Sequence, residues 1–350
     1  MTNRTAWVIY GANGFTGRLI AQQAKRDNLA PILAGRRAEP IEGLAAKLDL
    51  PWRSFDLNDS AAATAALGKV DVVLHCAGPF RTTSGPMIEA CLASRTHYLD
   101  ITGEIEVFVA AHARHADAQA AGIVVCPGVG FDVVPTDCVA AVLKEALPDA
   151  NALALGFDMS STPSPGTAKT MIEGLKAGGR VRRNGDIVEV PFAYRSRTID
   201  FGRGSALGVT IPWGDVATAY YSTGIPDIEV YVRTSPGALY VMRWLNGLRP
   251  ILPWAEPLLR QWAASIRGPS EDQLRQDTSY VWGEARNAAG TIRTARLTTP
   301  NGYRLTADAA ILAVQTVLEH RPPGGYYTPS RLMGARSVER LPGAGTIRIE

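Results

Sequence analysis

Short apolar runs alternate with helical segments through the first 126 residues. The runs, several of which stop at a glycine or an aspartate, cover residues 6–10, 30–34, 52–55, 70–76, 96–99 and 123–126. Runs of this length bounded by turn residues are typical of buried parallel strands. Helical patterns separate them at 15–27, 40–48, 61–67, 85–94 and 104–121. This alternation predicts a doubly wound parallel sheet.

The pattern changes after about residue 150. Apolar and polar positions alternate at 152–159, 187–194 and 226–232, which indicates a mixed or antiparallel sheet with one exposed face. Helical stretches are predicted at 167–177 and 236–265, and prolines at 250, 253 and 257 must break the second of these. Residues 305–320 form an amphipathic helical pattern.

Composition and charge narrow the class of protein. Apolar residues make up 46% of the chain and the net charge is +3, so the chain can build a packed core and is not globally disordered. It contains neither 18 consecutive apolar residues nor a leader with a long apolar segment, so no transmembrane segment is expected. The four cysteines are spaced by 15, 35 and 12 residues, which favours neither zinc nor disulfides and indicates a reduced, cytoplasmic protein.

The positive charge is concentrated after residue 150. Residues 151–350 hold 23 basic and 17 acidic residues, a balance of +6, while residues 1–150 hold 13 and 16, a balance of −3. Arginine suits anionic ligands, but this excess is too dilute to indicate nucleic-acid binding.

A glycine-rich loop is the sharpest motif. Gly11-Ala12-Asn13-Gly14-Phe15-Thr16-Gly17 follows an apolar run and opens a helix, which is the context of a dinucleotide-binding loop. Its glycines would permit the tight turn, the approach to a pyrophosphate and close helix packing. We therefore predict cofactor contacts from Gly11, Asn13, Gly14, Phe15, Thr16 and Gly17; the alternative is a plain glycine turn.

The residues after the second apolar run favour NADP over NAD. An acidic residue there would bind the ribose 2′-hydroxyl of NAD, but this chain has Arg36 and Arg37, which suit a 2′-phosphate. The alternative is that both arginines only decorate a loop. Asp56 follows the third run and would lie at the adenine edge or, equally, cap the next helix.

Three further loops follow apolar runs at the edge where such sheets bind ligands. They are His75 to Phe80, Tyr98 to Glu104 and Pro127 to Asp132. From the first of them we predict that Ala77, Gly78 and Pro79 line the cofactor, with Gly78 allowing close backbone approach.

These motifs resemble one enzyme family. The glycine loop, Cys76-Ala77-Gly78-Pro79-Phe80, Tyr98 to Glu104, and Pro127 to Asp137 together are similar to the saccharopine dehydrogenase-like oxidoreductases, and more narrowly to their trans-acting enoyl reductase branch. Gly302 to Ala307 and Gly325 to Pro329 extend the match, which is weakest over 180–280.

The resemblance implies NAD(P) use and a Rossmann domain interrupted by a second α+β domain, before a C-terminal helix returns to the first domain. We accordingly expect a dinucleotide-binding domain at 1–150, an α+β substrate and dimerisation domain at 151–300, and a helix and tail at 301–350 that return to the first.

Hydride transfer needs a proton donor or acceptor beside the reacting carbon. The candidates near the strand ends are Tyr98, Asp100, Glu104, Asp132, His75 and Asp137. We predict Tyr98 and Asp132 as the catalytic pair, although Tyr98 could equally be core and Asp132 a helix cap. His112 and His115 are three residues apart without further ligands, so no metal site is predicted.

The substrate side is less distinctive. Residues 162–168 precede a helix and could bind an anion, assisted by Arg180, Arg182 and Arg183. The apolar stretch 244–262 fits a lid, a dimer surface or core. The favoured function is an NADP-dependent, homodimeric oxidoreductase for a small-molecule substrate, a bulky and hydrophobic carbonyl or enoyl compound. The alternatives are a non-enzymatic NADP(H) sensor or partner protein, and an amino-acid dehydrogenase of the saccharopine type.

Overall fold

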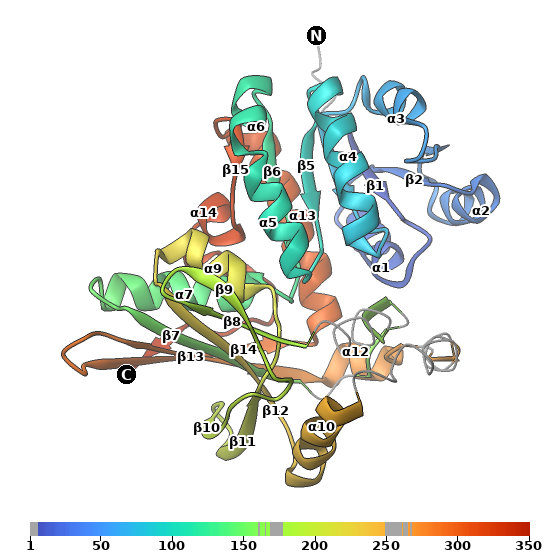
Figure 1. Cartoon of the computed structure of the whole chain (residues 1–350). Coiled ribbons are helices and arrows are strands. Elements are labelled where there is room, and N and C mark those ends of the chain that lie inside the picture. Colours follow the sequence, from blue (N-terminus) through green and yellow to red (C-terminus); the bar gives the residue numbers. More distant parts are fainter. Residues whose placement is uncertain are drawn as a thin grey trace. The chain divides into compact units, whose positions relative to one another are not determined.

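The six apolar runs of the N-terminal part lie side by side in one parallel sheet of the computed structural model (Figure 1). The structure describes residues 6–159, 162–164, 166–168, 178–248, 261, 265–266 and 268–350. The strands are β1 (Trp7–Tyr10), β2 (Ile32–Gly35), β3 (Trp52–Ser54), β4 (Val72–His75), β5 (His97–Asp100), β6 (Val124–Cys126) and β15 (Gly325–Tyr326). Their order is β15-β6-β5-β4-β1-β2-β3, and every neighbouring pair is parallel.

Helices cover this sheet because its central strands are apolar on both faces: every residue of β1 and β4 is buried. The helices are α1 (Phe15–Arg26), α2 (Ala38–Leu48), α3 (Ser60–Leu67), α4 (Phe80–Ser94), α5 (Ile105–Ala113), α6 (His115–Ala121), α13 (Gly302–His320) and α14 (Pro329–Met333). Contacts place α3, α4, α5 and α6 in one layer. Helix α13 lies against α1, where the rings of Phe15 and Tyr303 are 5.1 Å apart.

The strand order reverses at β1, which pairs with β2 on one side and with β4 on the other. At such a switch point the loops after the two central strands diverge and leave room for a ligand. The loop after β1 begins at Gly11 and the loop after β4 begins at Cys76, so the predicted cofactor residues lie at this point. The predicted doubly wound fold is confirmed.

Two histidines attach the returning segment to the first sheet. Nδ1 of His115 accepts the backbone N–H of Tyr326 at 3.0 Å, and the ring of His112 packs edge-on against the ring of Tyr326 at 5.0 Å. These contacts explain the pair of histidines without a metal ion. Among the residues that the structure describes, no group of three or more His, Cys, Asp or Glu side chains could hold one.

A second, mixed sheet is built from the rest of the chain. Its strands are β7 (Ala152–Asp158), β8 (Gly179–Arg183), β9 (Asp186–Val190), β10 (Ser196–Asp200), β11 (Ser205–Thr210), β12 (Asp227–Arg233), β13 (Thr278–Arg286), β14 (Ile292–Pro300) and β16 (Arg348–Ile349). The main path is β10-β11-β12-β7-β13-β14-β16; off this path, β8 pairs with β12 and β9 pairs with β8. Only the pair of β7 and β12 is parallel. The helical elements of this part are α7 (Val134–Ala146), α9 (Asp215–Thr223), α10 (Pro236–Leu248), α12 (Glu271–Gln276) and the 3-10 turn η2 (Ser337–Arg340).

The two faces of this second sheet differ in chemistry. On one face α7 packs so closely that a Cβ at Gly283 would lie 2.5 Å from Val139 and 2.7 Å from Leu143. The other face carries a buried cluster of Ile199, Phe201, Tyr231 and Trp282. The alternating pattern predicted from the sequence therefore marks a sheet with two different environments.

The chain divides at different residues from those predicted. The first unit comprises residues 1–134 and 303–334, and the second comprises residues 135–302 and 335–350. Helix α7 belongs to the second unit because it packs on Gly283. The tail also joins the second unit, since β16 pairs with β14. The returning segment is thus shorter than the predicted 301–350.

Two predicted helices differ from the structure, and two others lie largely outside the described residues. The helix expected at 104–121 is two helices, because Arg114 leaves helical geometry between α5 and α6. Helix α4 begins at Phe80, five residues before the predicted start, with Pro86 inside it. Of the helices predicted at 167–177 and 236–265, most of the first and the part of the second beyond Leu248 lie outside the described residues. Within the described part of the chain, no helix is long and apolar enough to cross a membrane.

Candidate functional site

The glycine loop packs so closely that two of its positions, which form the glycine cradle, have no room for a side chain. Gly11 has φ +83°, and a Cβ there would lie 2.7 Å from the backbone nitrogen of Ala77. A Cβ at Gly17 would lie 2.4 Å from the carbonyl oxygen of Gly11. Glycine is therefore required at both positions, once for the turn against the β4 loop and once for close packing of α1 on the loop.

Gly14 has a different role from Gly11 and Gly17. It is the exposed N-cap of α1, its backbone is extended (φ −69°, ψ 168°) and no side chain caps the helix. A Cβ at Gly14 would meet only the Gly11 carbonyl oxygen, at 3.2 Å. The first amides of α1, from Phe15 and Thr16, are thus approachable from outside, and helix N-termini of this kind bind phosphate groups. The residues present fit a dinucleotide pyrophosphate.

The predicted adenine-side residues gather at the ends of β1, β2 and β3. A Cβ at Gly35 would lie 3.4 Å from Oδ1 of Asn13, so the Asn13 side chain reaches the end of β2. The hydroxyl of Tyr10 donates to the carbonyl oxygen of Phe55 at 3.1 Å. Burial raises the pKa of Tyr10 to about 12; the charge of Asp56 adds to this shift and that of Arg36 opposes it. Arg36 and Asp56 therefore both lie within electrostatic range of Tyr10.

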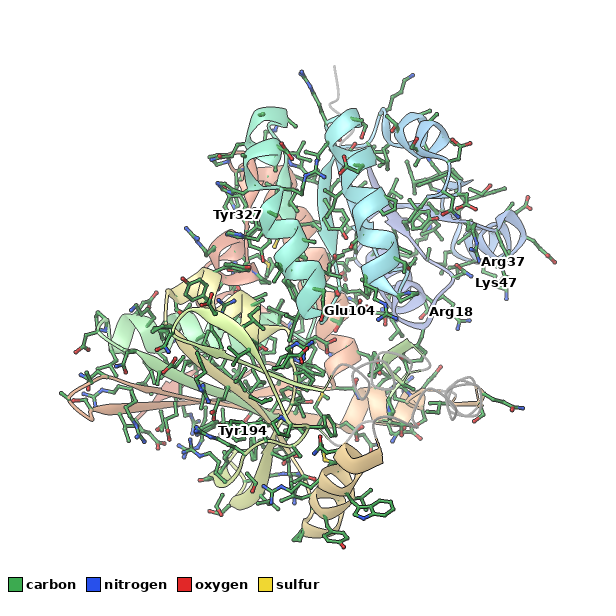
Figure 2. The ribbon with its side chains drawn as sticks, viewed as in Figure 1. Arg18, Arg37, Lys47, Glu104, Tyr194 and Tyr327 are labelled. Carbon is green, nitrogen blue, oxygen red and sulfur yellow. The ribbon has the colours of Figure 1, made fainter. Side chains whose placement is uncertain are left out.

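Arg36 and Arg37 are exposed directly after β2, and Arg37 is the N-cap of α2. Figure 2 shows Arg37 and Glu104 along the lower edge of the first unit, where the parallel strands end. Asp56 accepts the backbone N–H of Asn58 at 3.0 Å, while Asp59 is the residue that caps α3. Of the two alternatives for Asp56, the helix cap is supplied by Asp59 instead, and the position at the adenine edge stays a prediction.

Hydrogen bonds from buried side chains fix the position of the loop after β4. Oγ1 of Thr83 donates to the carbonyl oxygen of Ala77 at 2.7 Å, and it lies 2.9 Å from Nε2 of His75. His75 is fully buried, and this burial lowers its pKa to about 3, so the neutral imidazole holds the loop. Gly78 has only ordinary contacts, since a Cβ there would lie 3.6 Å from the ring of Phe80. The close packing in this loop is at Ala77, which touches Gly11.

Tyr98 and Asp100 form a buried pair at the end of β5. The Tyr98 hydroxyl donates to Oδ2 of Asp100 at 2.6 Å. Oδ1 of Asp100 accepts the backbone N–H groups of Thr102 at 2.9 Å and Gly128 at 2.8 Å. Burial raises the pKa of Asp100 to about 6, while these hydrogen bonds oppose that rise. The pair links the loops after β5 and β6, and the catalytic prediction for Tyr98 stays a prediction.

We expect Tyr98→Phe to act on stability. The substitution removes a donor from a buried carboxylate and should lower the free energy of unfolding by roughly 1–3 kcal/mol. The hydrogen bond favours the ionised form of Asp100, so the stability deficit should be larger at pH 8 than at pH 5, below its pKa of about 6. Denaturant unfolding at both pH values measures this, with Tyr240→Phe as the exposed control. An equally stable Tyr98→Phe chain would contradict the structural role.

Asp132 and Glu104 bring two carboxylates to neighbouring loops. A Cβ at Gly103 would lie 2.9 Å from Oδ2 of Asp132, so this carboxyl group lies over the β5 loop. Burial raises the pKa of Asp132 to about 6. The second carboxylate belongs to Glu104, the residue after Gly103. It accepts hydrogen bonds from the backbone N–H groups of Phe80 and Arg81 at 3.0 and 2.9 Å. Glu104 thus caps α4 and joins the β4 loop to the β5 loop, a role that the sequence motif alone did not assign to it.

Asp137, the remaining candidate, lies elsewhere. It is fully buried in α7 of the second unit, where the hydroxyl of Ser222 donates to it. Its position indicates a packing role between α7 and α9.

Several arginines of the second unit pair with carboxylates. Arg203 and Arg233 both pair with Asp158, Arg183 and Arg195 with Glu229, Arg197 with Glu284, and Arg180 with Glu189. Arg182 donates to the carbonyl oxygen of Val216 at 2.8 Å and stacks on the ring of Tyr220. The anion site expected from Arg180, Arg182 and Arg183 is therefore not supported, because these arginines already have partners. Part of the 162–168 segment lies outside the described residues.

Comparison with known proteins matches this arrangement. Residues 7–126 match the family model of the saccharopine dehydrogenase NADP binding domain. The saccharopine dehydrogenase-like oxidoreductase of Mus musculus is 30% identical over 150 residues, covering 37% of this chain and 35% of the mouse protein. The trans-acting enoyl reductase of Mycobacterium leprae (strain TN) is 35% identical over 139 residues, covering 37% of this chain and 33% of that protein. The matched region thus spans about a third of the length of these relatives.

A solved structure extends the likeness to the whole chain. Apo saccharopine dehydrogenase (L-Glu forming) from Saccharomyces cerevisiae superposes with a TM-score of 0.68, covering 99% of each chain, at 13% sequence identity. At this identity the likeness shows the fold alone, and it agrees with the predicted Rossmann domain and second α+β domain. The family resemblance expected from the motifs is confirmed, and the matched model is that of an NADP binding domain. The roles of Arg36 and Arg37 in selecting NADP over NAD stay predictions. Residues 7–126 are therefore similar to the saccharopine dehydrogenase NADP binding domain.

Proposed function

We propose that the chain is an NADP-dependent oxidoreductase that transfers a hydride to or from a bulky carbonyl or enoyl compound. The observation that carries the proposal is the position of Asp132, a carboxyl group with a raised pKa at the same sheet edge as the glycine cradle. Bound NADP(H) would supply the hydride chemistry. A group that exchanges protons near neutral pH is what such a reaction needs from the protein.

The chain's own residues would bind the cofactor and transfer the proton. Gly11, Gly14 and Gly17 with the first amides of α1 would hold the pyrophosphate, and Arg36 and Arg37 the 2′-phosphate. Ala77 to Pro79 would form the wall nearest the reacting end of the cofactor. Asp132 would give its proton to the substrate oxygen or carbon during reduction and take it back during oxidation. Glu104 would act indirectly, because it holds the β4 and β5 loops together.

Paired arginines weigh against the saccharopine-type amino-acid dehydrogenase. That activity needs unpaired cationic groups for a substrate with several carboxylates. In the described part of the second unit, Arg183, Arg195, Arg197, Arg203 and Arg233 all face carboxylates of the same unit. The hydrophobic substrate is a further proposal, which rests on the apolar composition of residues 244–262. The homodimer also stays a proposal, and no surface is assigned to it.

We expect Asp132→Asn to lower kcat by about 100-fold and to leave the Kd for NADPH unchanged, because the amide cannot exchange a proton. NADPH oxidation against a panel of aldehydes, ketones and enoyl thioesters measures turnover, and fluorescence quenching measures binding. The matched control is Asp117→Asn, an exposed acid of α6. Turnover that survives in Asp132→Asn would remove Asp132 from the mechanism.

Proton transfer by Asp132 predicts opposite pH dependences for reduction and oxidation. Reduction requires protonated Asp132, so its rate should fall as pH rises through about 6, whereas oxidation should become faster over the same range. Tight NADPH binding without turnover across the whole panel would instead support the non-enzymatic sensor.

A further inference from the structure

Helix α10 of the second unit, labelled in Figure 1, carries apolar side chains on its inner and on its outer face. Its inner face packs on the second sheet: Leu239 is buried against Ala193 and Val209, and Met242 joins the same cluster. Asn246 secures the helix, since its side chain accepts the N–H of Phe192 at 2.8 Å and donates to the Phe192 carbonyl oxygen at 2.7 Å. The inner face therefore fixes the orientation of the helix.

The outer face exposes large apolar side chains. Tyr240, Val241 and Trp244 are 73%, 55% and 62% exposed, the largest exposed fractions among the big apolar side chains described. Tyr240 and Val241 lie four and three residues before Trp244, and residues at these spacings lie on one side of a helix. The three side chains therefore form one patch around Trp244, here called the α10 patch. A helix that is apolar all round is typical of burial, and a contiguous exposed patch marks a contact surface.

The charge that α10 itself carries is positive. Arg243 is the only charged residue of α10, and its guanidinium donates to neutral groups, the carbonyl oxygen of Ala193 and the hydroxyl of Ser196. Between residues 234 and 270 the sequence contains four arginines and one acidic residue, Glu256. The same stretch contains three of the chain's seven tryptophans, at 244, 254 and 262.

We propose that the α10 patch docks on an anionic lipid bilayer and anchors the chain in the headgroup region. Tryptophan and tyrosine favour the membrane interface, and arginine is attracted to anionic headgroups. A second copy of the chain fits less well, because an isologous contact through α10 would bring its arginines together. The 13-residue helix is too short to span a bilayer, so the contact lies on the surface.

Cosedimentation of the full chain with vesicles tests this proposal. Vesicles of phosphatidylcholine with about one-third phosphatidylglycerol should bind the chain, and vesicles of phosphatidylcholine alone should bind it more weakly. The double variant Tyr240→Ser/Trp244→Ser should bind at least about tenfold more weakly. Trp52→Ser, which removes an exposed tryptophan of the first unit, is the matched control and should bind normally.

Arg243→Gln should reduce the preference for anionic vesicles, which separates the electrostatic contribution from the apolar one. The proposal is overturned if the wild-type chain ignores both vesicles, or if the double variant binds as well as wild type. It is also overturned if the chain binds no vesicles and is a dimer that the double variant converts to monomer, because a second copy then covers the patch. Circular dichroism of each variant checks that the fold is retained.

Discussion

Gly14→Val is expected to weaken NADP binding by about 1,000-fold while leaving the fold intact. The extended backbone at Gly14 accepts any residue, and its Cβ would meet only the Gly11 carbonyl oxygen at 3.2 Å. The valine methyl groups would cover the first amides of α1, where the pyrophosphate is expected. Two charge-assisted hydrogen bonds at roughly 1.5–3 kcal/mol each account for a loss of this size. Fluorescence titration with NADPH measures it.

A second glycine of the same loop provides the contrast. Gly17→Ala places a Cβ 2.4 Å from the Gly11 carbonyl oxygen and 2.9 Å from Cα of Ala12, both backbone atoms. Helix α1 must then move away from the loop, so this variant should lose thermal stability as well as NADP binding. Gly14→Val should keep a melting temperature close to wild type. Normal NADP affinity in Gly14→Val would refute the site assigned to the pyrophosphate.

The double variant Arg36→Asp/Arg37→Ala is expected to lower the preference for NADP over NAD by about 1,000-fold. Two guanidinium groups that bind a 2′-phosphate contribute roughly 1.5–3 kcal/mol each, and the new aspartate repels that phosphate while it accepts a ribose hydroxyl. Both arginines are exposed after β2, so the fold should tolerate the change. Isothermal titration with each cofactor gives the ratio of the two Kd values.

Arg26→Ala is the matched control for this pair. Arg26 lies at the C-terminal end of α1, where its guanidinium donates to the side chain of Gln23. Its removal should leave the ratio of the two Kd values unchanged. A double variant that still prefers NADP as strongly as wild type would show that Arg36 and Arg37 only decorate the loop.

Local patterns were enough for the first sheet and its cofactor loop. Each strand of a parallel sheet is buried on both faces, so it appears in the sequence as a short apolar run, and the glycine loop must follow the first run directly. The need for glycine at positions 11 and 17 was therefore predictable from their place after the first strand, and the structure shows the close backbone contacts that require it. Figure 1 shows the alternation of β1, α1, β2 and α2 that these runs predict.

Contacts between residues that are distant in the sequence could not be predicted from such local patterns. Glu104 reaches the N-terminus of α4 across 24 residues, and Tyr98 finds its acceptor in Asp100, which also binds Gly128. The pairing of Arg203 and Arg233 with Asp158 likewise depends on the register of the second sheet. A side chain's partner depends on which loops meet at a sheet edge, and spacing along the chain does not encode that meeting.

The amino-acid sequence was thus sufficient for the fold class and for the resemblance to an NADP binding domain, because each depends on neighbouring residues and on a short-range period. Only the folded chain shows that α7 and the C-terminal tail belong to the second unit. It also shows that Arg183, one of the arginines considered for an anion site, pairs with Glu229, and that Tyr240 and Trp244 are exposed. These outcomes depend on which surfaces pack together, and that is a property of the complete set of long-range contacts.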